Sequence, residues 1–315
     1  MPFSHHSHSG EFCPSHAYNT LEEMIQTAIA KHMEVFCLTE HMPRSDEDLY
    51  PEEIASGVTF QSLLTNEENY FRKANELRVK YSTQIHILIG FESEWIRNPG
   101  SLTLIQGSLS RFSYDFFVGS VHHMHGIPID WNREMYVRAR EKSGGTDERL
   151  WEDYFDEVFN MLLHLKPMVV GHFDLIRLQS DDPNLTKGGF KRGKGVWEKI
   201  QRNLKLINSY GGLLELNSAA LRKGLQAPYP AAEICQEFLA MNGRFCLSDD
   251  SHGVDHVGAK YHEMLDFTER QGITELYYLN LDSQSTSTVP DSRFPRTHFK
   301  SRSLSKIKQS TYWIM

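Results

Sequence analysis

Histidines and acidic residues stand at the ends of short apolar runs in this chain, and two pairs of them share one spacing. His6 and His8 form the first pair, and Asp250 and His252 form the second. Residues i and i+2 of an extended strand point to the same face, so each pair can present two ligands to one ion. Imidazole and carboxylate ligands without cysteine are typical of zinc, manganese or iron sites.

Seven apolar runs that read as buried strands are each followed by such groups or by other polar residues. In chain order these are His6, His8 and His16, then Glu40 and His41, Glu92 and Glu94, His122 and His123, His172 and Asp174, Asn217 and Arg222, and finally Asp249, Asp250 and His252. A histidine after one strand is explained equally well as a core or surface residue, but the recurrence indicates a shared site. In a parallel barrel the carboxyl ends of the strands meet at one face, where active sites lie.

The candidate metal ligands are too numerous for one ion. They are His6, His8, His16, His41, Glu92, His122, His172, Asp250 and His252. This set predicts two or three divalent ions, of zinc, manganese or iron, that share a bridging carboxylate. Glu92 is the favoured bridge and Glu94 the alternative, because both lie on one face of the strand. Neighbouring ions can polarise a phosphoryl oxygen and lower the pKa of a bound water to about 7, which is hydrolytic chemistry at phosphorus or, less often, at a carbonyl.

An alternation of strands and helices must position these residues. Strands are predicted near 2–7, 35–39, 85–91, 115–121, 168–172, 212–217 and 244–248, and helices near 20–32, 66–82, 101–111, 147–165, 194–209, 230–241 and 258–271. Short continuous apolar strands are typical of a parallel sheet that helices cover on both faces. Seven consecutive βα units therefore predict a single α/β domain that closes as a barrel rather than an open sheet.

The segments between and beyond these elements read as irregular. Residues 42–65 are predicted to form a loop and 178–195 a polar, mobile loop. The Ser/Thr-rich stretch 281–303 predicts an irregular surface tail, with residues 312–315 docked on the barrel. We therefore expect a barrel at 1–280 and a C-terminal tail at 281–315.

Composition and charge exclude several classes of function. No run of 18 apolar residues and no secretory signal are present, so we expect no membrane partner. The four cysteines form no CxxC pair, which favours a reducing compartment such as the cytoplasm. A net charge of −8 disfavours nucleic-acid binding. We find no phosphate-binding P-loop, no GxGxxG after a strand and no GxSxG nucleophile motif.

As an ordered set, seven motifs resemble those of the polymerase and histidinol phosphatase (PHP) superfamily. They are His6-Ser7-His8, Ser15-His16-Ala17-Tyr18, Thr39-Glu40-His41, Gly90-Phe91-Glu92, Gly119-Ser120-Val121-His122, Gly171-His172-Phe173-Asp174 and Ser248-Asp249-Asp250-Ser251-His252. The resemblance implies a distorted (β/α)7 TIM-like barrel with a trinuclear metal site at its carboxyl-end face. It implies these three ligand sets: His6, His8, Glu92 and Asp250; Glu92, His122 and His172; and His16, His41 and His252.

Other segments resemble, within the superfamily, the histidinol-phosphate phosphatases of the fungal type. They are SVHH at 120–123 before Gly126-Ile127-Pro128-Ile129-Asp130, GHFDLIR at 171–177, and Leu214-Glu215-Leu216-Asn217 leading to Leu221-Arg222-Lys223 and Tyr229-Pro230. The resemblance implies hydrolysis of L-histidinol phosphate to L-histidinol and phosphate in histidine biosynthesis. Asp250, His252 and Arg222 are expected to be catalytic. Arg177, Arg222 and His123 are expected to contact the substrate.

Other functions stay open at this point. A PHP-type phosphoesterase could act on another small phosphomonoester, or on nucleic-acid ends if the barrel carried a basic groove. An amidohydrolase-like hydrolase would use a carbamylated lysine at a strand end, and no lysine suits that role. A non-catalytic metal-binding barrel would have lost ligands, whereas every predicted ligand position here holds a histidine or a carboxylate.

Overall fold

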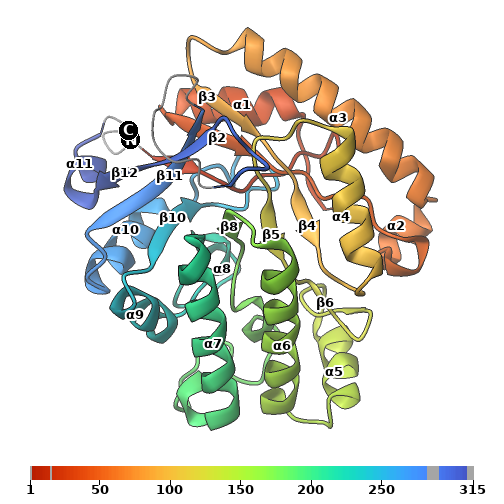
Figure 1. Cartoon of the computed structure of the whole chain (residues 1–315), viewed down its shortest axis with the longest axis vertical. Helices are drawn as coiled ribbons and strands as arrows, with labels where there is room; N and C mark the ends of the chain where they lie inside the picture. Colours follow the sequence, from red (N-terminus) through yellow and green to blue (C-terminus); the bar gives the residue numbers. More distant parts are fainter. Residues whose placement is uncertain (1, 15, 282–290, 311–315) are drawn as a thin grey trace.

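Parallel strands alternate with helices along the chain, as Figure 1 shows for the computed structural model, which describes residues 2–14, 16–281 and 291–310. Three strands form one sheet in the order β1 (Phe3–Ser4), β2 (Val35–Leu38) and β3 (His86–Ile89). Five form a second sheet in the order β10 (Arg244–Ser248), β9 (Leu213–Asn217), β8 (Val169–Val170), β5 (Val118–Ser120) and β4 (Glu92–Glu94).

Backbone contacts join the edges of the two sheets into a ring. The amide of His8 donates to the carbonyl of Ser251 at 2.7 Å, which joins the chain after β1 to the chain after β10. A parallel bridge between His41 and Glu92 joins the chain after β2 to β4. Since β3 continues into β4 after two residues, the ring has seven strands. This confirms the predicted distorted (β/α)7 TIM-like barrel.

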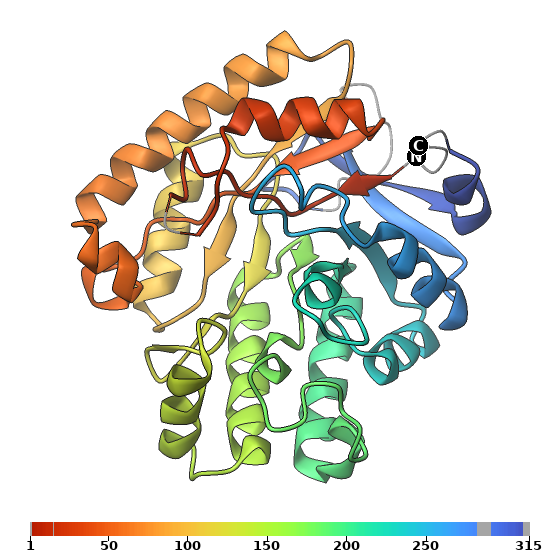
Figure 2. The same ribbon diagram turned by 180° about the vertical axis from the view of Figure 1, so that it is seen from behind.

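Helices cover the outside of the ring (Figures 1 and 2). The main ones are α1 (Leu21–Ala30), α3 (Phe60–Lys80), α4 (Gly100–Arg111), α6 (Asp147–Leu165), α7 (Lys194–Tyr210), α9 (Ala232–Ala240) and α10 (Tyr261–Arg270). Their apolar faces and the strands form one continuous core. In the part of the chain that the structure describes, no helix is long and apolar enough to cross a membrane.

The predicted loop at 42–65 contains helical segments, including a single 3-10 turn at Asp46–Asp48, so this prediction is wrong. The short helix α2 (Pro51–Ala55) lies inside it, and α3 begins at Phe60. Thr59 caps α3, because its hydroxyl accepts a hydrogen bond from the amide of Ser62 at 3.2 Å. The first buried residue of α3 is Glu67, so the buried face of the helix begins well after its start.

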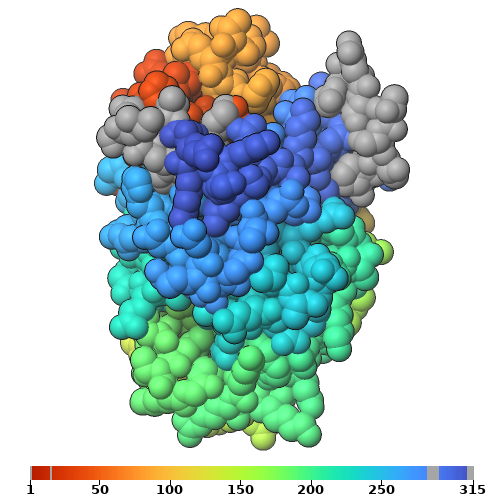
Figure 3. All heavy atoms as spheres, turned by 90° about the vertical axis from the view of Figure 1, so that its left-hand side faces the viewer, coloured from red at the N-terminus to blue at the C-terminus, as the bar shows by residue number. Residues whose placement is uncertain are grey.

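The predicted irregular tail at 281–303 is also wrong for its described residues. Strands β11 (Glu275–Leu281) and β12 (Thr297–Ser303) pair antiparallel, and α11 (Leu304–Lys308) follows. The hairpin packs on the barrel, where the Tyr278 ring stacks on Phe3 with centroids 4.9 Å apart. Figure 3 shows these C-terminal segments in blue on one side of the molecule. The boundary predicted at 280/281 falls inside β11, and residues 312–315 lie outside the described residues.

His5 joins this hairpin to the barrel. The ring is buried; its Nδ1 donates to the carbonyl of Leu247 at 2.9 Å, and its Nε2 accepts from the amide of Leu279 at 3.1 Å. Burial lowers the pKa of His5 from 6.5 to about 4. Replacing His5 by leucine is expected to lower the free energy of unfolding by about 2 kcal/mol, since the amide of Leu279 loses its partner and the carbonyl of Leu247 keeps only the backbone amide of residue 5.

The effect of His5→Leu should depend on pH. Because the folded pKa lies below the unfolded value, the contribution of His5 is complete above pH 6.5 and is lost as the pH falls toward 4. Urea unfolding at about pH 7.5 and about pH 5 measures this difference. The exposed His86, changed to leucine, is the control and should shift stability by no more than about 0.5 kcal/mol. An equal loss for His5→Leu at both pH values would contradict the assigned protonation state.

Candidate metal centre

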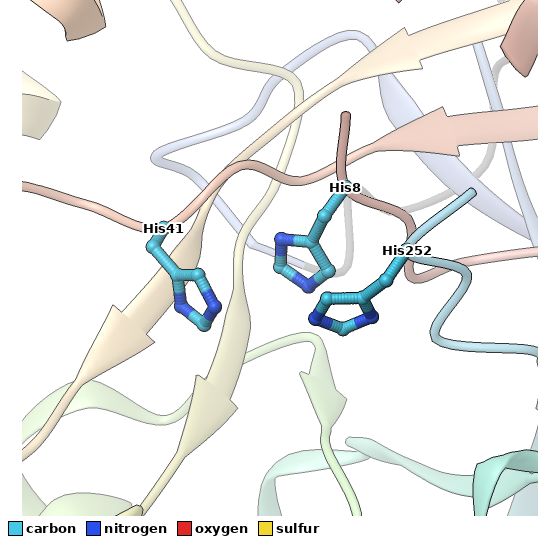
Figure 4. Close-up of side chains that lie close together, drawn as sticks. All are labelled: His8, His41 and His252. Carbon is cyan, nitrogen blue, oxygen red and sulfur yellow. The ribbon is translucent and has the colours of Figure 1, made fainter. Parts of the chain in front are cut away.

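Three histidines from distant parts of the chain converge at the carboxyl ends of the strands. Figure 4 shows His8, His41 and His252, which follow β1, β2 and β10, with their rings turned toward one another. The ring centroids of His8 and His41 are 4.4 Å apart, and those of His8 and His252 are 4.5 Å apart. One ligand atom from each of the three lies within 4.8 Å of the others. The group could hold one metal ion.

Two further groups with the same spacing share residues with each other. One consists of His6, His8 and Asp250, and the other of His6, Glu92 and His172. All of these side chains are buried. His6 belongs to both of these groups. His8 belongs to the first of them and also to the group of three histidines in Figure 4. The three groups therefore form one continuous cluster that could hold more than one ion.

Glu92 lies at the centre of this cluster. Its two carboxylate oxygens lie 2.9–3.4 Å from nitrogens of five histidines, which are His6, His8, His41, His122 and His172. Burial opposes ionisation of Glu92, but the charges of His6, His122 and His41 outweigh it and hold the pKa well below its usual range. The central position of the ionised carboxylate favours Glu92 over Glu94 as the predicted bridging ligand.

Glu94 lies behind the cluster rather than at its centre. Its Oε2 lies 2.9 Å from Nδ1 of His122, and its Oε1 lies 3.0 Å from Nδ1 of His41. Arg44 donates to Oε1 of Glu94 at 3.1 Å. Glu94 thus orients the imidazole of His122, which reaches Glu92, as carboxylates commonly do for metal-ligating histidines.

Unsatisfied buried nitrogens show that the donor set fits metal ions. Nε2 of His6, both nitrogens of His8 and Nδ1 of His41 are buried without a hydrogen-bond partner. Nδ1 of His41 even lies about 3 Å from two carboxylates without bonding to either. Buried polar atoms without partners are costly, and divalent cations between the imidazoles and carboxylates would satisfy them.

Glu215, which is not among the residues predicted from the sequence, contacts two of the candidate ligands. Its Oε1 lies 2.9 Å from Nδ1 of His6, and its Oε2 accepts the backbone amide of His172 at 2.7 Å. The signal was available, because Glu215 is the one charged residue in the buried apolar strand β9. A buried carboxylate requires partners, and here it fixes two candidate ligands.

Glu40 and Asp249, each next to a candidate ligand, hold the chain around the cluster by hydrogen bonds, and Oε2 of Glu40 also lies 4.0 Å from Nδ1 of His8. Glu40 accepts hydrogen bonds from the amide and hydroxyl of Ser9 at 2.9 and 2.6 Å. Asp249 accepts from the Ser4 hydroxyl at 2.9 Å and from the Gly258 amide at 2.7 Å. Adjacent residues at a strand end point in different directions, which separates supporting from ligating carboxylates.

His16 is placed apart from the three groups. Its two ring nitrogens lie 3.6 Å from Glu52 and from Glu53, and its ring centroid lies 6.0 Å from that of His41. His8 occupies the position beside His41 and His252 that the resemblance gave to His16. The assignment of His16 as a ligand therefore stays a prediction.

A cavity of about 540 Å³ opens over the cluster. Its lining consists of His16, His41, Tyr50, Glu92, His122, Asp130, Trp131, His172, Leu175, Arg222, Lys223, Asp250, His252 and His256. Arg222 donates to the carbonyls of Asp249 and Asp250 at 2.8 and 2.9 Å. Because a guanidinium has five N–H groups, Arg222 keeps donors for a bound anion. The sequence analysis did not single out Lys223, Tyr50 or Trp131 as lining residues.

Arg177 is placed away from the cavity, and its predicted contact with the substrate stays a prediction. The side chain is buried and outside the cavity lining, and it donates to Asp174 at 2.8 Å. It also donates to the carbonyls of Pro183, Ala227 and Pro228. Arg177 therefore braces two loops, and the sequence alone could not distinguish it from Arg222.

His123 also lies outside the cavity lining. Its ring meets the Tyr50 ring edge-on with centroids 5.2 Å apart, and neither of its nitrogens has a hydrogen-bond partner. Burial lowers its pKa to about 4. In this arrangement Tyr50, rather than His123, lines the cavity, and the predicted contact between His123 and the substrate stays a prediction.

Arg44 is buried between Glu94 and Glu53, to both of which it donates hydrogen bonds. Arg44→Met is expected to lower the free energy of unfolding by about 3 kcal/mol, because it removes the buried positive charge from between two buried carboxylates. Burial opposes ionisation of Glu53, but His16 and Arg44 outweigh it and lower its pKa to about 2. This stabilisation is therefore complete above pH 4.5 and is lost as the pH falls toward 2.

Urea unfolding at about pH 7 and about pH 3.5 measures the effect of Arg44→Met. We expect the difference from the wild type to shrink at the lower pH. Arg72→Met is the matched control, because Arg72 makes an exposed ion pair with Glu76 that is worth little. A cost for Arg44→Met that stays the same at both pH values would contradict the ion pairing.

Comparisons with known proteins indicate the family of this chain. A family model described as PHP domain matches residues 4–219. Over 290 residues the chain is 42% identical to a Schizosaccharomyces pombe protein named "Probable histidinol-phosphatase", covering 92% of this chain and 93% of that protein. It is 33% identical to the Saccharomyces cerevisiae protein named "Histidinol-phosphatase", covering 82% and 85%.

A solved structure has the same fold. It is the histidinol phosphate phosphatase of Lactococcus lactis subsp. lactis complexed with zinc, L-histidinol and phosphate, with a TM-score of 0.66 and 21% identity. The match covers 88% of this chain and 95% of that one. The family model and both fungal relatives span most of the chain, so this protein belongs to the PHP domain family.

Proposed function

We propose that this chain is a metal-dependent histidinol-phosphate phosphatase, which hydrolyses L-histidinol phosphate to L-histidinol and phosphate in histidine biosynthesis. The observation that carries the proposal is the ionised Glu92 among five histidines beneath a cavity lined by Arg222 and Lys223. The names of the two fungal relatives support the choice of substrate.

The residues around the cavity can bind the phosphate group and move protons. Arg222 can donate charge-assisted hydrogen bonds to phosphoryl oxygens. Asp250 lines the cavity and lies 3.6 Å from Nε2 of His8 and 3.5 Å from Nδ1 of His252. Its carboxylate can take the proton of the attacking water or return it to the leaving alkoxide when the P–O ester bond breaks. Bound divalent ions supply the Lewis acid that polarises the phosphoryl group and activates water.

Two or three ions of zinc, manganese or iron would be held by the predicted ligands. His6, His8, Glu92 and Asp250 form one proposed set, and Glu92 with His122 and His172 forms the second. The proposed third set is His41 and His252 with His16, or with His8, which lies nearer in the structure. We further propose that the protein acts in the reducing cytoplasm, where its four buried thiols are compatible with their unpaired state.

Phosphate release by the purified protein tests the proposal. L-histidinol phosphate is compared with a panel of small phosphomonoesters, with manganese or zinc added. We expect a preference of at least about 100-fold in kcat/KM for L-histidinol phosphate, since this site can pair with several substrate groups. Slow and equal release across the panel would contradict the substrate assignment and favour another phosphoesterase activity.

A further inference from the structure

The cavity over the metal centre has two walls of different chemistry. Arg222 and Lys223 belong to the segment after β9 and offer positive charge. Asp130 and Trp131 belong to the segment after β5 and offer a carboxylate and an aromatic ring. Since β8 lies between β5 and β9 in the sheet, these two walls stand apart across the mouth. A ligand that fills the cavity would meet positive charge at one side and negative charge at the other.

A small hairpin sets the position of Asp130. Strands β6 (His123–Met124) and β7 (Ile127–Pro128) pair antiparallel, and the turn between them has positive φ at both His125 and Gly126. Such turns match the twist of a hairpin. The amide of Ile129 then donates to the carbonyl of His122 at 2.9 Å. This bond holds Asp130 next to a candidate metal ligand.

The carboxylate of Asp130 has an unsatisfied buried atom. Its Oδ1 is buried and has no hydrogen-bond partner, although the side chain lines the cavity. The other carboxylates that line the cavity differ, since Glu92 and Asp250 both lie close to histidine nitrogens. A buried acceptor without a donor is costly, and an ammonium group in the cavity would supply one.

Aromatic rings stand beside Asp130. The Tyr50 and Trp131 ring centroids are 5.8 Å apart, and both rings line the cavity. His16 meets them edge-on at 4.7 and 5.7 Å. Such rings can contact a flat heteroaromatic group and attract a cation.

We propose that Asp130 binds the ammonium group of the substrate, while Tyr50 and Trp131 contact the imidazole ring of the substrate. Asp130 thereby determines which phosphomonoesters this enzyme prefers. The inference rests on the proposed function and deepens it. Arg222 and Lys223 would hold the phosphate while Asp130 holds the cationic end, so the cavity selects phosphomonoesters that carry an amine. Phosphomonoesters without a cationic group would leave Oδ1 of Asp130 buried and unpaired.

Kinetics on a matched pair of substrates test the role of Asp130. The pair is L-histidinol phosphate and the same phosphomonoester without its amine, 3-(imidazol-4-yl)propyl phosphate. For Asp130→Asn we expect kcat/KM on L-histidinol phosphate to fall by about 100-fold, mainly through KM, because a charge-assisted hydrogen bond is lost. The loss on the amine-free analogue should be at least about ten-fold smaller.

Asp153→Asn is the matched control. Asp153 belongs to α6, lies 3.4 Å from His125 and does not line the cavity. Its replacement should change kcat/KM by less than about two-fold on both substrates. Trp131→Ala provides a second variant. Its loss of kcat/KM is expected to be larger for imidazole-bearing substrates than for phosphoethanolamine.

The outcomes separate this inference from the proposed function. Equal losses for Asp130→Asn on both members of the pair overturn the inference, even if the wild type prefers L-histidinol phosphate. A wild type that prefers another amine-bearing phosphomonoester contradicts the proposed function, and Asp130→Asn must then abolish that preference for the inference to stand. A wild type without any preference for the amine overturns the inference.

Discussion

Replacing Glu92 by glutamine is expected to lower kcat/KM by at least about 1,000-fold and to remove bound metal, the largest effect we predict. Glutamine keeps the size of the side chain but not its charge. Glu92 is the only carboxylate whose two oxygens contact five histidines among the described residues. Without the negative charge, neighbouring cations at this position would repel each other unscreened.

Metal content and phosphate release, measured on the same preparations of Glu92→Gln, test this expectation. Metal per chain is determined after dialysis against buffer without added ions. The exposed Glu68 on α3, changed to glutamine, is the control and should keep wild-type metal content and activity. If Glu92→Gln kept its full metal content, Glu92 could not be the bridging ligand.

Replacing Asp250 by asparagine is expected to lower kcat by about 100- to 1,000-fold with a smaller change in KM. Oδ1 of Asp250 lies 3.8 Å from His6 and 3.6 Å from His8. The residue has a positive φ of 48°, which asparagine tolerates well, so the backbone should stay in place. The variant therefore loses a charge and a proton acceptor but not the shape of the site.

The two variants Asp250→Asn and Glu92→Gln are expected to differ in the amount of metal that they retain. Asp250 belongs to one ligand group, whereas Glu92 contacts histidines of all three, so we expect the loss of no more than one ion per chain. Asp266→Asn, at an exposed position of α10, is the control and should behave as the wild type. A variant at Asp250 with unchanged kcat would exclude its role in proton transfer.

A second layer of charged side chains holds the candidate ligands in place. Glu215 contacts His6 and the backbone of His172, and Glu94 contacts His122. Arg44 in turn binds Glu94. Such outer contacts set the ring orientation of ligating histidines, and their loss commonly weakens metal affinity by about 10- to 100-fold.

The sequence did not distinguish residues at the centre of the site from residues that surround it. Glu92 and Glu94 lie on the same face of one strand, so periodicity could not tell which is central and which is flanking. Arg177 and Arg222 both follow barrel strands, yet one binds backbone carbonyls in the interior and the other lines the cavity. The difference comes from loops whose path depends on contacts distant in sequence.

The sequence by itself determined the fold class and the face of the barrel that carries the chemistry. Short apolar strands alternate with helices, and the polar residues at their carboxyl ends must meet at one face once the strands run parallel. Tertiary structure decided which of these residues meet. It placed His8 beside His41 and His252, left His16 beside Glu52 and Glu53, and paired the C-terminal strands. These outcomes depend on closure of the barrel and on burial, which bring together groups that no local pattern relates.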